Sequence, residues 1–383
     1  MTPGARVAAA AEILDAILDG SPAEKALTSW ARRSRFAGSK DRAAVRDHVF
    51  DALRRKRTAA AMGGAMTGRG LMLGLLRLAG ADPAELMNGE GHALPPPLPG
   101  ETGRTPEAGA EAADIPDWLW PLWNESLGGM ATACADALKD RAPVFLRVNL
   151  RQATVAEAAD RLRGEGIETR PAPLSPTALE VIAGARGLRN SESFAQGIVE
   201  LQDAASQAVV DALPLRDGMR VLDYCAGGGG KSLAMGARAD LRLWAHDAAP
   251  ARMRDLPARA ARAGLAVTLT DAPERHGPYD LVLCDAPCSG SGSWRRAPEG
   301  KWLLTPEGLA ALQGTQSAIL DQAAALVSQT GVLAYATCSM LTAENDDQIR
   351  AFVARNPDWR VEKQASWRVT DGADGFFMAL LTR

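Results

Sequence analysis

The apolar positions of the first part of the chain follow the spacing of helices. Val7 and Leu14 share one face of a predicted helix, and Val45 and Val49 share one face of another. No segment here alternates between apolar and polar residues as a half-buried strand does. The pattern therefore predicts an all-helical bundle over residues 1–88.

The next segment, residues 89–115, contains few bulky side chains. Most of it is the sequence GEGHALPPPLPGETGRTPEAGAEAA, which has five prolines and five glycines. Such a segment buries too little apolar surface to offset the entropy lost on ordering, so we expect a linker. Three tryptophans follow at positions 118, 120 and 123, and we expect them to be packing anchors because no Lys or Arg lies nearby.

Strand patterns begin after residue 143. VFLRVNL, IETRPAP and ALEVI are predicted strands, and Thr154 is the predicted N-cap of a helix between the first two. Together they indicate a small α/β unit within residues 116–190. From residue 191 to 383 strands and helices alternate, which is typical of an α/β fold with a doubly wound, mostly parallel sheet. Strands of this sheet are expected at 219–223, 241–246, 266–270, 279–285, 332–337, 359–363 and 375–382.

Composition narrows the class of protein. The 383 residues are 46% hydrophobic and 23% charged, and no apolar run approaches the roughly 18 residues that cross a bilayer. The five cysteines are an odd number without regular spacing, which argues against a secreted disulfide framework and favours a cytoplasmic protein. The net charge is −3, yet residues 32–57 hold ten Lys or Arg against three Asp. This basic stretch either binds phosphates or forms a solvated helix face.

A glycine-rich segment, VLDYCAGGGGKS, joins the first strand of the large sheet to its first helix. Glycines at this point let the backbone turn sharply and approach a ligand. A P-loop would need a glycine where the chain has Cys225, although Gly230, Lys231 and Ser232 match the end of that motif. A dinucleotide site would need Gly-x-Gly-x-x-Gly, which four consecutive glycines fit poorly. S-adenosylmethionine is the third candidate.

Acidic residues favour this third ligand. An aspartate closes each of the first four strands of the sheet, at Asp223, Asp247, Asp271 and Asp285. Carboxylates repel a triphosphate, whereas they attract the sulfonium and ammonium groups of S-adenosylmethionine. Asp247, which lies 24 residues after Asp223, is well placed to accept hydrogen bonds from ribose hydroxyls.

Two cysteines follow predicted strands of the same sheet. Cys288 lies in DAPCSGSG and Cys338 in YATCS. We expect both strands beside the first strand, with their ends at one edge about 4.8 Å apart, so that both sulfurs reach one planar substrate. A thiolate that adds to C6 of cytosine makes C5 nucleophilic, and Asp285, if protonated, would be the acid near N3. The chemistry alone does not choose between the two thiols. We expect Cys134 and Cys284 to be packing residues and no metal site, because the four histidines are scattered.

The motifs DYCAGGGGKS, DAPCSGSGSWRRAPEGKW and YATCSMLTAEND resemble those of the Sun-type RNA cytosine-5 methyltransferases. The resemblance implies a class I, Rossmann-like methyltransferase domain at 191–383, with Cys338 as the nucleophile and Cys288 as the group that assists release. It also implies S-adenosylmethionine contacts from Cys225, Ala226, Gly227, Gly228, Gly229, Gly230, Lys231, Asp247, Asp271 and Asp285. One departure is Gly228, which stands where the family usually has proline.

The resemblance extends to the rest of the chain and implies an RNA partner. The small α/β unit is similar to the family's RNA-binding unit, and residues 1–88 are similar to a NusB-like domain. The implied substrate is 16S ribosomal RNA, with transfer RNA as the alternative. Hypotheses of other classes are a P-loop ATPase and a catalytically silent ribosome-assembly factor. We expect a monomer without metal or membrane contact.

RNA contacts are also expected near the Cys288 motif. Arg295, Arg296 and Lys301 alternate with tryptophans at 294 and 302, which pairs cations for phosphates with flat surfaces for an unstacked base. The alternative is a surface loop held by tryptophan packing.

Overall fold

The computed structural model describes all residues, Met1–Arg383, and divides into two compact units. The N-terminal unit consists of Met1–Arg141 and Trp294–Leu303, and the C-terminal unit consists of Ala142–Ser293 and Leu304–Arg383. The chain therefore leaves the C-terminal unit once, shortly after Cys288, and contributes a short segment to the N-terminal unit.

The N-terminal unit is helical, as the apolar spacing predicts. Its core joins Leu14, Val49 and Leu71, which come from three different helices. Between Leu86 and Trp120 the chain has turns but no helix or strand. The helices are α1 (Pro3–Leu18), α2 (Ala23–Arg33), α3 (Ser39–Arg54), α4 (Lys56–Gly63), α5 (Gly68–Leu78), α6 (Pro83–Leu86), α7 (Trp120–Leu127), α8 (Ala131–Ala137) and α14 (Glu299–Leu303).

A small antiparallel sheet opens the C-terminal unit. Its strands are β1 (Val144–Val148), β2 (Glu168–Pro171), β3 (Ala178–Ala183) and β4 (Val199–Leu201), in the order β2-β3-β1-β4. Two helices accompany it, α9 (Val155–Gly164), which Thr154 caps as predicted, and α10 (Glu192–Ala195). The sequence pattern does not predict β4, because three residues are too few to establish an alternation. The sheet thus extends past the expected limit at residue 190.

The large sheet has seven strands in the order β10-β11-β9-β8-β5-β6-β7. Strands β5 to β9 are parallel to one another, and β11 pairs antiparallel with both β9 and β10. All seven predicted strands are present, which confirms the α/β fold. One expectation needs correction: β8 adjoins β5, but β9 adjoins β8 and is one strand removed from β5. The strands are β5 (Arg220–Asp223), β6 (Arg242–Ala245), β7 (Thr268–Leu269), β8 (Tyr279–Asp285), β9 (Val327–Thr337), β10 (Arg360–Trp367) and β11 (Phe376–Thr382).

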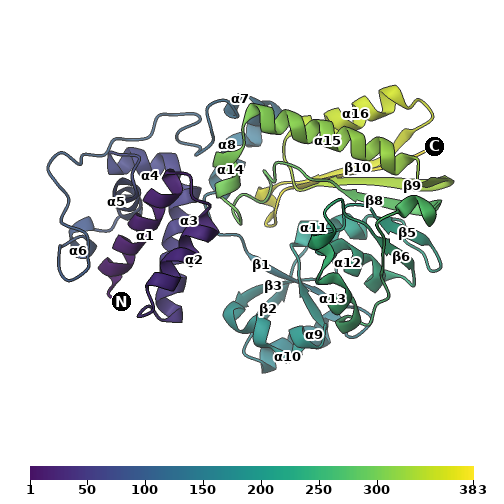
Figure 1. Cartoon of the computed structure of the whole chain (residues 1–383), viewed down its shortest axis with the longest axis horizontal. Helices are drawn as coiled ribbons and strands as arrows, with labels where there is room; N and C mark the ends of the chain where they lie inside the picture. Colours follow the sequence, from purple (N-terminus) through teal and green to yellow (C-terminus); the bar gives the residue numbers. More distant parts are fainter. The chain divides into compact units, whose positions relative to one another are not determined.

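Helices cover both faces of this sheet (Figure 1). Leu281 and Leu283 of β8 belong to the core on one face, where α11 and α12 pack, while Val282 and Cys284 belong to the core on the other face, with α15 and α16. A strand that is buried on both faces appears as a continuous apolar run, as LVLC does. The helices are α11 (Ala204–Asp211), α12 (Gly230–Arg238), α13 (Leu256–Arg262), α15 (Pro306–Ala324) and α16 (Asp346–Arg355).

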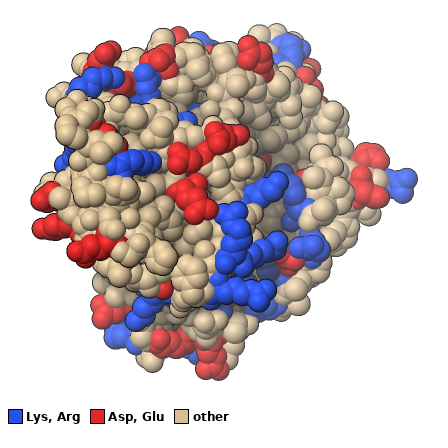
Figure 2. All heavy atoms as spheres, turned by 60° about the vertical axis from the view of Figure 1, so that its left-hand side comes forward, with Lys and Arg blue, Asp and Glu red and all other residues tan.

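Charged side chains of both signs are mixed over most of the face in Figure 2, with one patch where Lys and Arg gather. The basic stretch 32–57 is only partly available to a ligand. Arg54 is buried, and Arg55 and Arg57 form ion pairs with Asp140 and Asp117 inside the N-terminal unit. The structure contains no helix that has both the length and the apolar character to cross a membrane.

Candidate active site

Two neighbouring strand ends bring the cysteines of the predicted pair together. Asp285, the last residue of β8, lies in register with Ala336 near the end of β9, and the chain reaches Cys288 and Cys338 directly afterwards. Their sulfur atoms are 3.4 Å apart. Gly292 N donates to Cys338 O at 2.9 Å, so the two loops are also joined through their backbones. The strands therefore place both thiols at one point on the sheet edge.

The surroundings of the two sulfurs differ, and this distinguishes their chemistry. The pKa of Cys338 is lowered, chiefly because its sulfur accepts a hydrogen bond from the Cys288 thiol, and the positive charge of Lys231 acts in the same direction. The pKa of Cys288 is raised well above its ordinary value by that hydrogen bond, by burial and by the negative charge of Glu344. These directions favour ionisation of Cys338 over Cys288, although burial and the Asp285 carboxylate act against the Cys338 thiolate. With Cys338 ionised, Cys288 is the hydrogen donor in their contact.

The other three cysteines lack this environment. Burial raises the pKa of both Cys225 and Cys284, and neighbouring carboxylates add to the effect. Cys134 is fully buried in the N-terminal unit. Cys134 and Cys284 are packing residues, as expected from the sequence.

The glycine-rich loop after β5 needs glycine at two of its positions. Gly227 and Gly229 have φ values of +53° and +79°, in the left-handed region that side chains disfavour. A Cβ atom at Gly229 would also lie 2.2 Å from Leu256 Cδ1. Gly228 is different, because its φ is not left-handed and a Cβ there would approach only Arg259, at 3.2 Å from Nη1.

Arginine side chains of other elements donate hydrogen bonds to the backbone of this loop. Arg259 of α13 donates to Gly228 O, and its Nε donates to Glu200 of β4 at 3.0 Å. Arg147 of β1 donates to Gly230 O at 2.8 Å. Polar side chains of the small sheet and α13 thus restrain a loop that lacks the proline usual in the Sun-type enzymes.

We expect Arg259→Ala to weaken S-adenosylmethionine binding about fivefold, since a loop hydrogen bond of about 1 kcal/mol is lost. Gly228→Pro in the same variant should recover most of this loss, because proline reduces the freedom of the unbound loop. Calorimetric titration measures both effects. Arg254→Ala is the matched control, because Arg254 is highly exposed and pairs only with Asp255. Equal affinities for the wild type and Arg259→Ala would show that the arginine does not restrain the loop.

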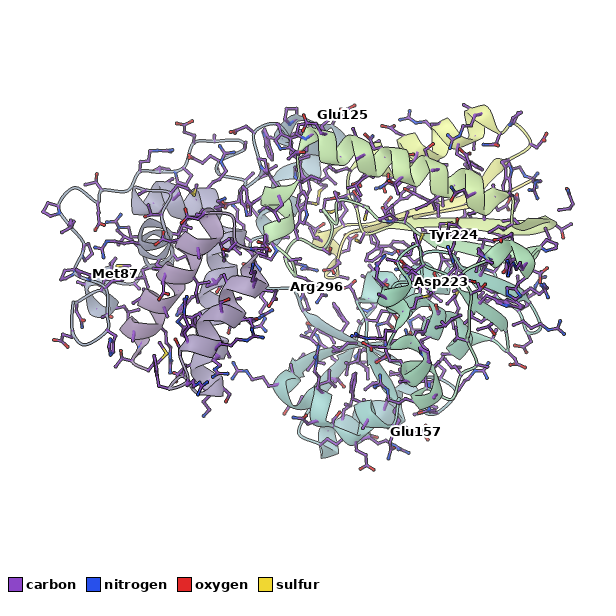
Figure 3. All side chains as sticks on the ribbon, in the orientation of Figure 1. Met87, Glu125, Glu157, Asp223, Tyr224 and Arg296 are labelled. Carbon is purple, nitrogen blue, oxygen red and sulfur yellow. The ribbon has the colours of Figure 1, made fainter.

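The acids at the strand ends occupy three distinct environments. Asp247 is buried, and its carboxylate accepts from Gly227 N at 2.8 Å and from Arg252 at 3.1 Å. Asp223 lies at the end of β5, next to Tyr224 (Figure 3). Burial raises the pKa of Asp223 to about 7, and its Oδ1 is buried without a hydrogen-bond partner. Asp271 is exposed after the two-residue strand β7.

Lys231 and Asp285 form an ion pair at the same edge. Lys231 Nζ lies 2.7 Å from Asp285 Oδ2 and 4.9 Å from the centre of the Phe376 ring. In this structure the Asp285 carboxylate accepts a hydrogen bond from the Lys231 ammonium, and its role as an acid near N3 stays a prediction. The pair supplies an N–H donor and a carboxylate acceptor beside the two thiols.

Two of the three predicted RNA contacts are corrected by the structure. Arg295 is 5% exposed and Lys301 is 1% exposed, both inside the N-terminal unit, where Lys301 Nζ donates to Arg54 O at 3.3 Å. Burial lowers the pKa of Lys301 to about 7. Trp294 is buried against Trp123, with ring centres 6.0 Å apart. Arg296 is exposed (Figure 3) and is the one residue of the three that can meet RNA in this arrangement.

Glu344 is a buried acid that contacts both cysteine loops, and the sequence pattern did not predict its place in the site. A signal was present, since Glu344 is an acid within the YATCSMLTAEND motif, only six residues after Cys338. Acids are rarely buried without a specific set of donors.

Comparison with known proteins gives consistent matches. The profile of the 16S rRNA methyltransferase RsmB/F family matches residues 210–382, and that of an RsmF/B-like ferredoxin-like domain matches residues 115–185. The ribosomal RNA small subunit methyltransferase B of Xylella fastidiosa strain 9a5c is 35% identical over 300 residues, which cover 73% of this chain and 71% of the relative. That of Photorhabdus laumondii is 32% identical, over 70% of this chain and 66% of the relative. The alignments thus span just under two thirds of the length of several relatives.

Solved structures share the fold. The protein PH0851 superposes with a TM-score of 0.78 at 22% identity, over 100% of this chain and 99% of its own. A methyltransferase homologue from Pyrococcus horikoshii has a TM-score of 0.62 at 21% identity, over 71% of this chain and 96% of its own.

Proposed function

The chain belongs to the RsmB/F family of 16S rRNA methyltransferases, and we propose that it methylates C5 of a cytosine in small-subunit ribosomal RNA through a covalent Cys338–C6 adduct. The family's cofactor is S-adenosylmethionine. The observation that carries the proposal is the Cys288–Cys338 contact of 3.4 Å, in which one thiol favours ionisation of the other. Methylation of C5 requires such a nucleophile, because C5 is unreactive until a group adds at C6.

The residues at the sheet edge fit the cofactor. Four consecutive glycines give the loop a backbone without side chains, and Asp223 Oδ1 is a buried acceptor without a partner. The carboxylates of Asp223, Asp247 and Asp285 lie at or just after the ends of neighbouring strands at this edge, and they suit a ligand with two cationic groups. When bound, S-adenosylmethionine supplies an electrophilic methyl group. The residues proposed to hold it are those of the loop from Cys225 to Lys231, with Asp247, Asp271 and Asp285.

The chain's own groups account for the remaining chemistry. The Cys338 thiolate forms a bond to C6, and the electron pair of the C5–C6 double bond is delocalised over C5 and N3. Lys231 and Asp285 can donate to and accept from the polar edge of the cytosine, because their ion pair lies within the same site. After C5 is methylated, a base removes the C5 proton, the C5–C6 double bond forms again, and the C6–S bond breaks to release the Cys338 thiolate. We assign assistance in this release to Cys288.

A direct comparison of ligands tests the class of protein. Calorimetry should detect binding of S-adenosylmethionine and no binding of ATP with Mg²⁺, since Lys231 is already paired with Asp285 and Cys225 replaces the first P-loop glycine. Transfer of tritiated methyl groups to undermodified 16S RNA, with undermodified transfer RNA in parallel, tests the substrate. Cofactor binding without transfer to either RNA would favour a silent assembly factor, and transfer to transfer RNA alone would favour the alternative substrate.

A further inference from the structure

A buried carboxylate contacts the residue that follows each of the two cysteines. Glu344, the last residue of the short 3-10 helix Thr342–Glu344, is 0% exposed. Its Oε1 accepts from Ser289 N at 2.7 Å, and its Oε2 accepts from the Ser289 hydroxyl and from Ser339 Oγ, the latter at 2.5 Å. Ser289 follows Cys288, and Ser339 follows Cys338. One side chain therefore holds both loops.

Other elements fix the carboxylate itself. Gln316 Nε2 of α15 donates to Glu344 Oε1 at 3.0 Å and to Pro287 O at 3.0 Å. Tyr335 of β9 donates its hydroxyl to Glu344 O at 2.7 Å. A buried acid is costly unless its oxygens are satisfied, and here four donors meet the two oxygens. The Glu344 carboxylate accepts hydrogen bonds from both cysteine loops and from α15, so a movement of one loop would disturb the contacts of the other.

We propose that Glu344 is a positioning residue, which sets the distance between the two sulfurs and keeps Cys288 as the hydrogen donor to Cys338. The proposal rests on the proposed function only for the consequence in catalysis. Three charged groups face the pair: Lys231 of α12 favours a thiolate at Cys338, Asp285 of β8 opposes it, and Glu344 opposes a thiolate at Cys288. A negative charge beside Cys288 disfavours a thiolate there and leaves the anion to Cys338.

The first experiment needs no RNA. The full-length protein is treated with limiting iodoacetamide, and the modified cysteines are identified by peptide mass spectrometry. In the wild type we expect Cys338 to react well ahead of Cys288. In Glu344→Gln this preference should fall at least about fivefold, since the charge that disfavours a Cys288 thiolate is gone. Glu362→Gln removes the same charge from the exposed strand β10 and should leave the preference unchanged.

The second experiment measures the consequence in catalysis. Misplacement of the sulfurs by about 1 Å should lower kcat for methyl transfer about 10²-fold in Glu344→Gln. Affinity for S-adenosylmethionine should stay within about twofold of the wild type, because Glu344 does not contact the glycine loop. Loss of cofactor affinity in parallel with kcat would mean that Glu344 only maintains the fold, and would overturn the proposal. Unchanged cysteine preference in Glu344→Gln would overturn it as well.

Two further outcomes separate the positioning role of Glu344 from a folding defect and from the proposed function. If Glu344→Gln does not fold, Ser339→Ala removes one donor from the network and should cause a smaller change of the same sign in cysteine preference. Wild-type preference in that variant would contradict the proposal. If the wild type shows the preference, and Glu344→Gln loses it, while no RNA is methylated, the proposed function fails and the positioning role stands.

Discussion

We expect Cys338→Ala to abolish methyl transfer and to leave the cofactor site intact. In the proposed mechanism the thiolate at this position forms the bond to C6. We do not expect Cys288 to replace it, because the pKa of Cys288 is raised well above its ordinary value. Loss of a nucleophile commonly removes most of the rate enhancement of an enzyme, so we expect kcat to fall by at least about 10³-fold. Affinity for S-adenosylmethionine should remain within about twofold, because Cys338 lies outside the glycine loop.

The measurement combines a tritiated-methyl assay with calorimetry on the same preparations. Cys134→Ala is the matched control, because it removes a buried thiol from the N-terminal unit and should leave the rate nearly unchanged. A Cys338→Ala enzyme with wild-type turnover would remove Cys338 from the role of nucleophile. Loss of cofactor affinity together with turnover would point instead to a local collapse of the site.

The sequence was most informative where local patterns and strand topology coincide. The run LVLC before Cys288 and the run ending at Thr337 both predict buried parallel strands, and such strands end at one edge of a sheet. The strand pattern alone predicted that two cysteines 50 positions apart share one site, and in the structure their sulfur atoms are 3.4 Å apart. It could not assign roles to them, because the choice depends on Lys231 and Glu344, whose positions follow from packing.

Expectations from the sequence about exposure were wrong for charged residues that the structure buries. Lys301 and Arg295 lie in a polar segment that is typical of a surface loop, yet the segment belongs to the N-terminal unit and both side chains are buried there. Non-local packing of this kind leaves no periodic signal. Glu344 was missed for the complementary reason, since a single acid in a polar stretch normally faces solvent. The hydrogen bonds from Ser289 and Ser339 are the observations from which we propose its positioning role.

Cys288→Ala should differ from Cys338→Ala in the step that it affects. It should still allow the covalent adduct to form, and it should slow release of the adduct. Cys338 keeps Lys231 nearby and can still add to C6, although it loses the hydrogen bond that most lowers its pKa. We therefore expect adduct formation to be slower but to proceed. Release should be slower still, because the side chain that contacts Cys338 sulfur no longer carries a group that can move a proton.

The expected result for Cys288→Ala is an accumulated protein–RNA conjugate. Incubation with 16S RNA and S-adenosylmethionine should give a band of lower mobility on a denaturing gel, and the band should be absent from the double variant Cys288→Ala, Cys338→Ala. The double variant ties the conjugate to the Cys338 sulfur, because the single change alone could expose another nucleophile. If Cys288→Ala forms no such band and turns over more slowly, Cys288 does not assist release, and the 3.4 Å contact serves only to activate Cys338. That outcome would still leave the nucleophile assigned, since the two cysteines act at different steps and their variants are measured by different products.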